Sequence, residues 1–71
     1  MSDRDVEKEY SDAATIQKLE RLVDCMKQGK PFQIQVDGQR VYVPVRARFT
    51  IEHEIEGDKE ELEFQFKWTQ K

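Results

Sequence analysis

The spacing of the hydrophobic residues changes once along this 71-residue chain, at Pro31, and that change limits the folds available to it. Before Pro31 the apolar residues recur every three or four positions, which is the period of one face of an α-helix. After Pro31 they recur at every second position, which is the period of strands with one apolar face. This order predicts an α+β fold, with one N-terminal helix followed by a sheet.

The first pattern predicts a helix over about residues 12–28. Ser11 is suited to cap its N-terminus, because a serine hydroxyl accepts a hydrogen bond from a free backbone N–H. Gly29 can take the left-handed conformation that ends many helices, and Pro31 cannot continue the helix. The apolar stripe of this helix comprises Ala13, Ile16, Leu19, Leu22, Val23 and Met26.

The second pattern predicts four strands, at about residues 32–36, 39–43, 47–56 and 60–69. Asp37-Gly38 is a strong hairpin signal, Pro44 lies in the next loop, and Gly57-Asp58 makes the last turn. We therefore expect a four-stranded antiparallel β-meander whose apolar face is covered by the helix. On this face we expect a core of Phe32, Phe49, Phe64 and Phe66, with Trp68 at its margin.

The domain organisation follows from the same patterns. Residues 11–71 are expected to form a single α+β domain, because a chain this short builds one small core. Residues 1–10 are dense in charge and are expected to be a frayed tail. Since Val6, Lys8 and Tyr10 alternate with acidic residues, a short extra strand at a sheet edge is the alternative.

The chain also resembles a known family. The residues that carry the resemblance are a helix ending in Leu22–Lys30, the strand end Val36-Asp37-Gly38, the segment Val41–Pro44 and the closing Phe66-Lys67-Trp68. Over about residues 11–68 this pattern is similar to the amphi-Trp domain family. The resemblance implies the fold described above and small bacterial and archaeal proteins of no established activity. It supplies no catalytic residues.

No group of residues predicts a catalytic, cofactor or metal site. His53 is followed by Glu54, but Gly57 stands where the H-E-x-x-H zinc motif needs its second histidine. Cys25 lies near the predicted helix C-terminus, where the helix dipole opposes a thiolate. We therefore expect a hydrogen-bonded His53 at the edge of the apolar face, and a half-buried structural Cys25.

The glutamates of the second hairpin, from Glu52 to Glu63, lack the spacing of a calcium loop. Their charge is expected to keep the hairpin in water, and weak binding of a divalent cation is the alternative. Twelve basic against fifteen acidic residues give a net charge of −3, which disfavours non-specific nucleic-acid binding. A single cysteine favours a reducing cytoplasm, and no apolar run approaches the ~20 residues of a membrane span.

The outward face of the predicted sheet is not uniform. Gln33, Tyr42, Arg48 and Lys67 are expected in one row across the four strands, whereas Glu52 faces Glu63 and Glu54 faces Glu61 farther out. We therefore predict a non-enzymatic protein-interaction module, acting through this face and the free edge of the last strand. Its partner is another protein or a second copy of the chain. The candidate surface comprises Gln33, Tyr42, Arg48, Lys67, Glu63 and Trp68.

Two other functions compete with this one. A nucleic-acid accessory domain would use a local basic and aromatic patch of Arg40, Tyr42, Arg46, Arg48 and Lys67. An enzyme or small-ligand binder ranks third, because one helix over four strands leaves little interior space for a substrate pocket.

Overall fold

The computed structural model describes residues 4–70. It contains one helix, α1 (Asp12–Gln28), and four strands, β1 (Phe32–Val36), β2 (Gln39–Val43), β3 (Arg48–Glu56) and β4 (Lys59–Lys67). Every boundary lies within two residues of the expected one, and the strand pairs are antiparallel. The predicted α+β class is therefore confirmed.

Both ends of α1 are capped as the sequence predicts. The Ser11 hydroxyl accepts a hydrogen bond from the Ala14 N–H at 3.2 Å. Gly29 takes the left-handed conformation with φ of 66°, and the Lys30 N–H donates to the Cys25 carbonyl at 2.9 Å. These contacts satisfy backbone groups that the helix leaves without partners.

Each pair of strands is a hairpin with a two-residue turn. Asp37 and Gly38 have φ of 50° and 83°, and positive φ at both central residues is the requirement of a type I′ turn. The second turn begins at Gly57, with φ of 63°. In the resulting registers Gln33 lies opposite Tyr42, and Arg48 lies opposite Lys67, as the sequence predicts.

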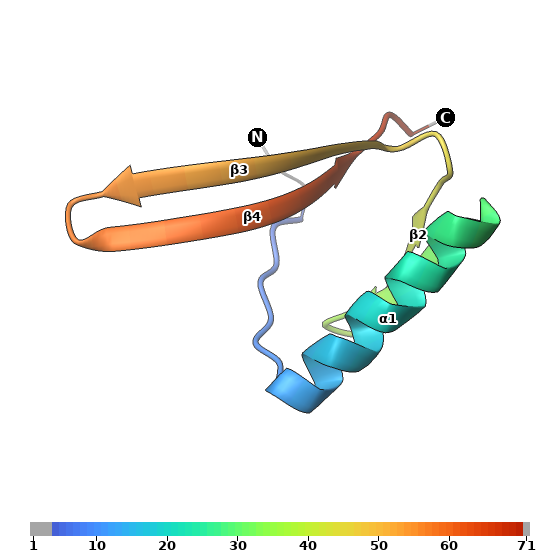
Figure 1. Cartoon of the computed structure of the whole chain (residues 1–71), viewed down its shortest axis with the longest axis horizontal. Helices are drawn as coiled ribbons and strands as arrows, with labels where there is room; N and C mark the ends of the chain where they lie inside the picture. Colours follow the sequence, from blue (N-terminus) through green and yellow to red (C-terminus); the bar gives the residue numbers. More distant parts are fainter. Residues whose placement is uncertain (1–3, 71) are drawn as a thin grey trace.

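The two hairpins do not join, so the prediction of one four-stranded sheet is wrong. β1–β2 and β3–β4 form two separate two-stranded sheets, and Figure 1 shows the longer hairpin pointing away from the rest. Pro44 has no N–H to donate to a ladder, and its carbonyl accepts the Ala47 N–H at 3.1 Å in a tight turn. The expected row of Gln33, Tyr42, Arg48 and Lys67 therefore exists only as two unconnected pairs.

α1 packs on the first hairpin. The Arg21 Nη1 donates to the Gln33 carbonyl at 3.1 Å, and the guanidinium carbon lies 5.0 Å from the centroid of the Phe32 ring. Phe32 is 7% exposed and is the one buried large apolar residue in the part of the chain that the structure describes. The expected core is thus present only beneath the helix.

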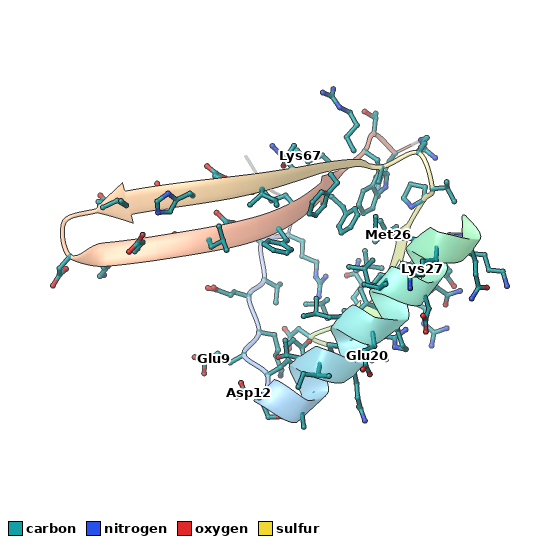
Figure 2. The ribbon with its side chains drawn as sticks, in the orientation of Figure 1. Glu9, Asp12, Glu20, Met26, Lys27 and Lys67 are labelled. Atoms are coloured by element: carbon teal, nitrogen blue, oxygen red, sulfur yellow. The ribbon has the colours of Figure 1, made fainter. Side chains whose placement is uncertain are left out.

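The second hairpin has no such cover, which corrects the predicted core. Phe49 and Phe64 are 44% and 59% exposed, while Phe66 and Trp68 are half-buried. Most of the helix stripe is also open to water, and Met26 lies near the hairpin base (Figure 2). The physical reason is geometric, because one helix of 17 residues cannot cover two sheets that diverge.

The segment before α1 contains neither helix nor strand over residues 4–11. Arg4 Nη2 donates to the Val36 carbonyl at 2.6 Å, and Lys18 Nζ lies 4.4 Å from the centroid of the Tyr10 ring. The alternative of an edge strand at residues 6–10 is therefore wrong, and the tail is tethered to the β1–β2 turn and to α1. Residues 1–3 of the expected tail lie outside the described part.

Within residues 4–70, no helix combines the length and apolar character needed to cross a membrane.

Candidate interaction surface

An uncovered apolar surface lies on one side of β3–β4, and we call it the hairpin apolar face. It comprises Phe49, Ile51, Ile55, Leu62 and Phe64, which are 44–65% exposed. The register places these side chains on one side because alternate residues of a strand share a face. The Phe49 ring lies 5.8 Å from the Phe64 ring and 5.1 Å from the Phe66 ring, centroid to centroid, so the base of the face is an aromatic cluster.

A second uncovered apolar surface runs along α1, and we call it the outer stripe. It comprises Ile16, Leu19, Val23 and Met26, which are 46–55% exposed. Their spacing of three and four residues aligns them on one side of the helix. The neighbouring Leu22 and Cys25 are half-buried, so only one margin of the predicted stripe contacts the protein.

The two surfaces meet at the base of the hairpin. Met26 at the end of the outer stripe and Phe49 at the start of the hairpin apolar face line the same small hollow. Its other apolar side chains include those of Leu22, Phe32, Val43 and Phe66. The covered core under α1 therefore continues into both uncovered surfaces.

The structure separates most of the predicted surface residues but brings two of them together. Gln33 and Tyr42 lie on β1–β2, whereas Arg48, Lys67 and Glu63 lie on the outer side of β3–β4. Tyr42 and Trp68 line one shallow hollow, together with Pro31, Pro44, Val45, Arg46 and Gln70. Arg46 Nη2 donates to the Thr69 carbonyl at 2.7 Å and so holds the C-terminal segment beside this hollow.

The side of β3–β4 opposite the hairpin apolar face is acidic, as predicted. Glu52 pairs with Glu63 and Glu54 with Glu61. Nearer the base, the Thr50 hydroxyl donates to Gln65 Oε1, and Gln65 Nε2 donates to Glu52 Oε1, both at 3.2 Å. This side is therefore strongly polar and largely exposed.

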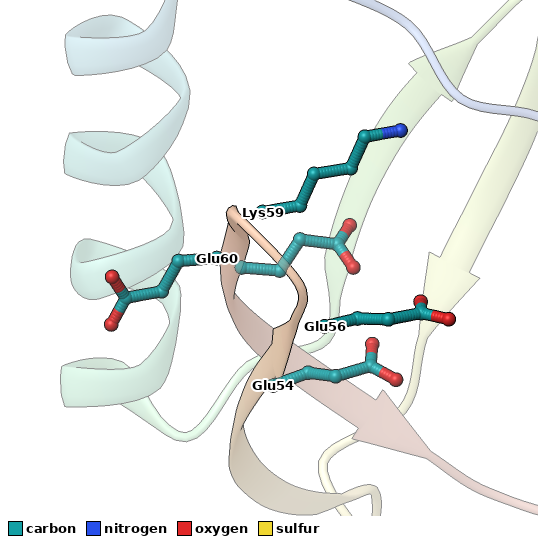
Figure 3. A pocket seen from close by; sticks show the side chains of 5 residues that line it. Glu54, Glu56, Lys59 and Glu60 are labelled. Carbon is teal, nitrogen blue, oxygen red and sulfur yellow. The ribbon is translucent and has the colours of Figure 1, made fainter.

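Three of these carboxylates crowd each other near the hairpin tip. Oxygen atoms of Glu54, Glu61 and Glu63 lie within 4.8 Å of one another. The pKa of Glu61 is raised. The largest cause is the negative charge of Glu63, and a hydrogen bond to Glu54 and the charge of Glu54 raise it further. Figure 3 shows Glu54, Glu56 and Lys59 extending to one side of the tip. Three exposed carboxylates supply about half of the six to eight oxygens that Ca²⁺ takes, so they do not by themselves define a metal site.

The two residues with reactive side chains lie where the sequence predicts. His53 Nε2 lies 2.7 Å from Glu60 Oε2 on the side of the hairpin apolar face, and both side chains are exposed. Cys25 is half-buried on α1. The expectations of a hydrogen-bonded His53 and a half-buried Cys25 are confirmed.

Comparison of the chain with family models, with curated proteins and with solved structures finds no match. The resemblance to the amphi-Trp domain family therefore stays a prediction.

The sequence interpretation missed that these apolar side chains are uncovered, because it assigned the alternating apolar residues to a core. The difference in strand length could have indicated that the second hairpin extends beyond its cover. β3 and β4 are nine residues long, whereas β1 and β2 are five.

Proposed function

We propose that this chain is a protein-interaction module whose contact surface is the hairpin apolar face. The observation that supports this is the 44–65% exposure of its five large apolar side chains. Transfer of apolar surface out of water is favourable, and contiguous exposed apolar patches mark sites that bind other proteins. A partner that covers this face gains that free energy.

The shape of the hairpin supports a protein partner. β3 pairs with β4 and not with β2, so within the described residues each strand of this hairpin keeps one free edge. A free edge offers backbone N–H and C=O groups to a partner, as the sequence predicts for the last strand. Glu61, Glu63 and Lys67 on β4 oppose indiscriminate pairing by their charge.

A non-enzymatic role is part of the proposal. Acid–base catalysis depends on groups held in a cleft that restricts water. The titratable groups that the structure brings together, such as Glu54 and Glu61, instead lie exposed on the outer side of the hairpin. This placement suits a solvated surface better than a catalytic centre.

A second candidate function, nucleic-acid binding, is favoured by one observation. Trp68 and Arg46 line the same hollow as Tyr42, which adds a second aromatic ring to the predicted basic patch. The net charge of −3 and the acidic side of β3–β4 oppose this function. Binding of a random single-stranded oligonucleotide that weakens steeply with salt would support it, and no binding at low salt would exclude it.

Site-specific photo-crosslinking tests the proposed interaction. A photo-reactive amino acid is placed at Ile51 on the hairpin apolar face or, as the matched control, at Thr50 on the opposite side of the same strand. Irradiation in a cell extract, with purified chain added, is expected to give discrete protein adducts from position 51 and few from position 50. Adducts to a second copy of the chain count as protein adducts. No adduct from position 51, or equal adducts from both positions, contradicts the proposal.

A further inference from the structure

We propose that the partner is a second copy of the chain, and that α1 of each copy covers the hairpin apolar face of the other. This inference rests on the proposed function, because it takes the hairpin apolar face as a protein contact. It adds the identity of the partner and the surface that the partner uses, namely the outer stripe of Ile16, Leu19, Val23 and Met26. The two copies are related by a two-fold axis, so the contact occurs twice.

The accessible surface of the single chain is too large for a compact monomer. The chain exposes 6628 Å² at a mass of 8.5 kDa. Folded monomers of this mass expose roughly 4,700 Å². The excess of roughly 1,900 Å² lies within the range of roughly 1,000–2,500 Å² that each subunit of an obligate homodimer buries. One symmetric interface is large enough to cover much of this surplus, to which the exposed segment of residues 4–11 also contributes.

The dimensions of the chain lead to the same conclusion. Its radius of gyration is 13.6 Å, and its extents are 40 × 32 × 24 Å. A compact domain of 71 residues has a radius of gyration of roughly 11 Å. The extended shape arises because the β3–β4 hairpin points away from α1 (Figure 1). The segment before α1 runs between the hairpin and the helix in the view of Figure 1, and the proposed second copy lies against the exposed apolar side chains of the hairpin.

The two uncovered surfaces are complementary in kind and in length. A two-stranded sheet with one apolar face needs a helix or another sheet against that face, and an amphipathic helix needs a similar cover. The 17 residues of α1 span about 25 Å, and the nine residues of β3 span about 30 Å. One helix therefore covers most of one hairpin, and a two-fold dimer provides one helix for each hairpin.

Within one chain the helix is not free to make this contact. α1 is held on β1 by the 3.1 Å hydrogen bond from Arg21 to the Gln33 carbonyl and by the stacking of Arg21 over Phe32. Its C-terminus is joined to β1 through the short Gly29–Pro31 connection. The turn from Pro44 to Ala47 sends β3 in another direction. The outer stripe therefore meets its own hairpin only at the base, near Met26 and Phe49.

On the hairpin, the distribution of charge suits this interface, whereas Glu20 and Asp24 lie beside Ile16, Leu19 and Val23 of the outer stripe. Burial of an unpaired charge is costly, so an apolar contact requires charged groups to remain outside it. Glu52, Glu54, Glu61 and Glu63 all lie on the opposite side of the hairpin and stay in water when the apolar face is covered. On the covered side, Glu60 lies opposite Ile55 toward the tip, and its Oε2 is 2.7 Å from His53 Nε2, so this polar pair is part of the proposed contact.

The first test measures mass by sedimentation across a concentration series. The wild-type chain is expected to sediment at about 17 kDa, twice the chain mass of 8.5 kDa. Leu19→Glu in the outer stripe and Ile51→Glu on the hairpin apolar face are each expected to raise the dimer Kd by roughly 100-fold or more. Thr50→Glu, on the opposite side of β3, is the matched control and is expected to leave the Kd within about threefold. Equal effects of Ile51→Glu and Thr50→Glu contradict the proposal.

The second test does not depend on a disruptive variant. A spin label is attached at Glu20→Cys, beside the outer stripe, in a Cys25→Ser background. The labelled chain is mixed with unlabelled chain enriched in ¹⁵N, and line broadening is compared with that from a diamagnetic label. Broadening of β3–β4 amides in the ¹⁵N copy is expected. A dimer in which the broadening is confined to other elements overturns the inference.

The outcomes separate this inference from the proposed function. A chain that stays monomeric at every concentration, yet gives adducts to another protein from position 51, overturns the dimer and leaves the interaction module standing. A chain that gives no adduct from position 51 to any protein, itself included, overturns both.

Discussion

The two hairpins of this chain have the same alternation of apolar and polar residues and differ in what lies against them. β1–β2 has α1 on its apolar face, and Phe32 is 7% exposed there. β3–β4 is nearly twice as long and has no helix, and its Phe64 is 59% exposed. The comparison shows that burial depends on the presence of a second layer and not on the strand pattern alone.

The difference also explains why the longer hairpin is the candidate surface. A two-stranded hairpin alone is marginally stable in water, and its apolar face gains stability only when it is covered. The first hairpin obtains this cover within the chain, from Leu22 and its neighbours on α1. The second hairpin lacks this cover within the described residues, so the proposed partner is expected to stabilise it.

The largest effect is expected from truncation in the covered region. Phe32→Ala removes the buried side chain beneath α1, and loss of a buried phenylalanine costs roughly 3–5 kcal/mol. A chain of this size holds about that much stability in total, so we expect the helix to melt. Phe64→Ala removes a side chain that is 59% exposed and is expected to cost less than half as much in dilute protein. Urea unfolding followed by helical circular dichroism measures both.

Protein concentration is expected to change the cost of these two substitutions differently. Because the proposed dimer buries Phe64, the cost of Phe64→Ala is expected to rise when unfolding is repeated well above the dimer Kd. The cost of Phe32→Ala is expected to depend less on concentration, because α1 of the same chain covers this residue. Equal costs for the two variants in dilute protein would show that the hairpin apolar face is covered within the chain.

The sequence was sufficient to predict the local structure and much of the register. Ser11, Gly29 and Asp37-Gly38 act through their immediate neighbours, so their effects can be inferred without knowledge of the rest of the fold. The facing glutamate pairs of β3–β4 also follow from the two-residue turn at Gly57, because turn length determines register.

The sequence did not predict how the two hairpins are arranged relative to each other. Whether β2 pairs with β3 depends on the path of the Pro44–Ala47 turn, and that path is decided by three-dimensional packing. Alternation identifies Phe49 and Ile51 as apolar positions, but it does not say whether the covering layer comes from the same chain. The predicted row of surface residues fails for the same reason, since Tyr42 and Arg48 lie on separate sheets.

An intermediate effect is expected from substitutions in the two hairpin turns. These substitutions test whether the two hairpins unfold independently. Gly38 and Gly57 have φ of 83° and 63°, and a side chain in this conformation costs roughly 1–2 kcal/mol. A Cβ added at either position would have no atom within 4 Å, so strain and not collision is the cause. Gly38→Ala is expected to speed amide hydrogen exchange in β1 and β2, and Gly57→Ala in β3 and β4. Equal acceleration in both hairpins after either substitution would show one cooperative unit.

The smallest effect is expected from the acidic side of the longer hairpin. Repulsion by Glu63, and contact with Glu54, raise the pKa of Glu61 above its ordinary value of 4.5. The folded hairpin therefore binds this proton more tightly than the unfolded chain does. The resulting stabilisation is fully present below pH 4.5 and is lost as the pH rises through the raised pKa. Glu61→Gln is accordingly expected to raise the urea midpoint of β3–β4 slightly at pH 7 and to have a smaller effect at pH 4. Glu20→Gln on α1 is the matched control in the covered region, and a rise at pH 7 as large as that of Glu61→Gln would show a general effect of net charge.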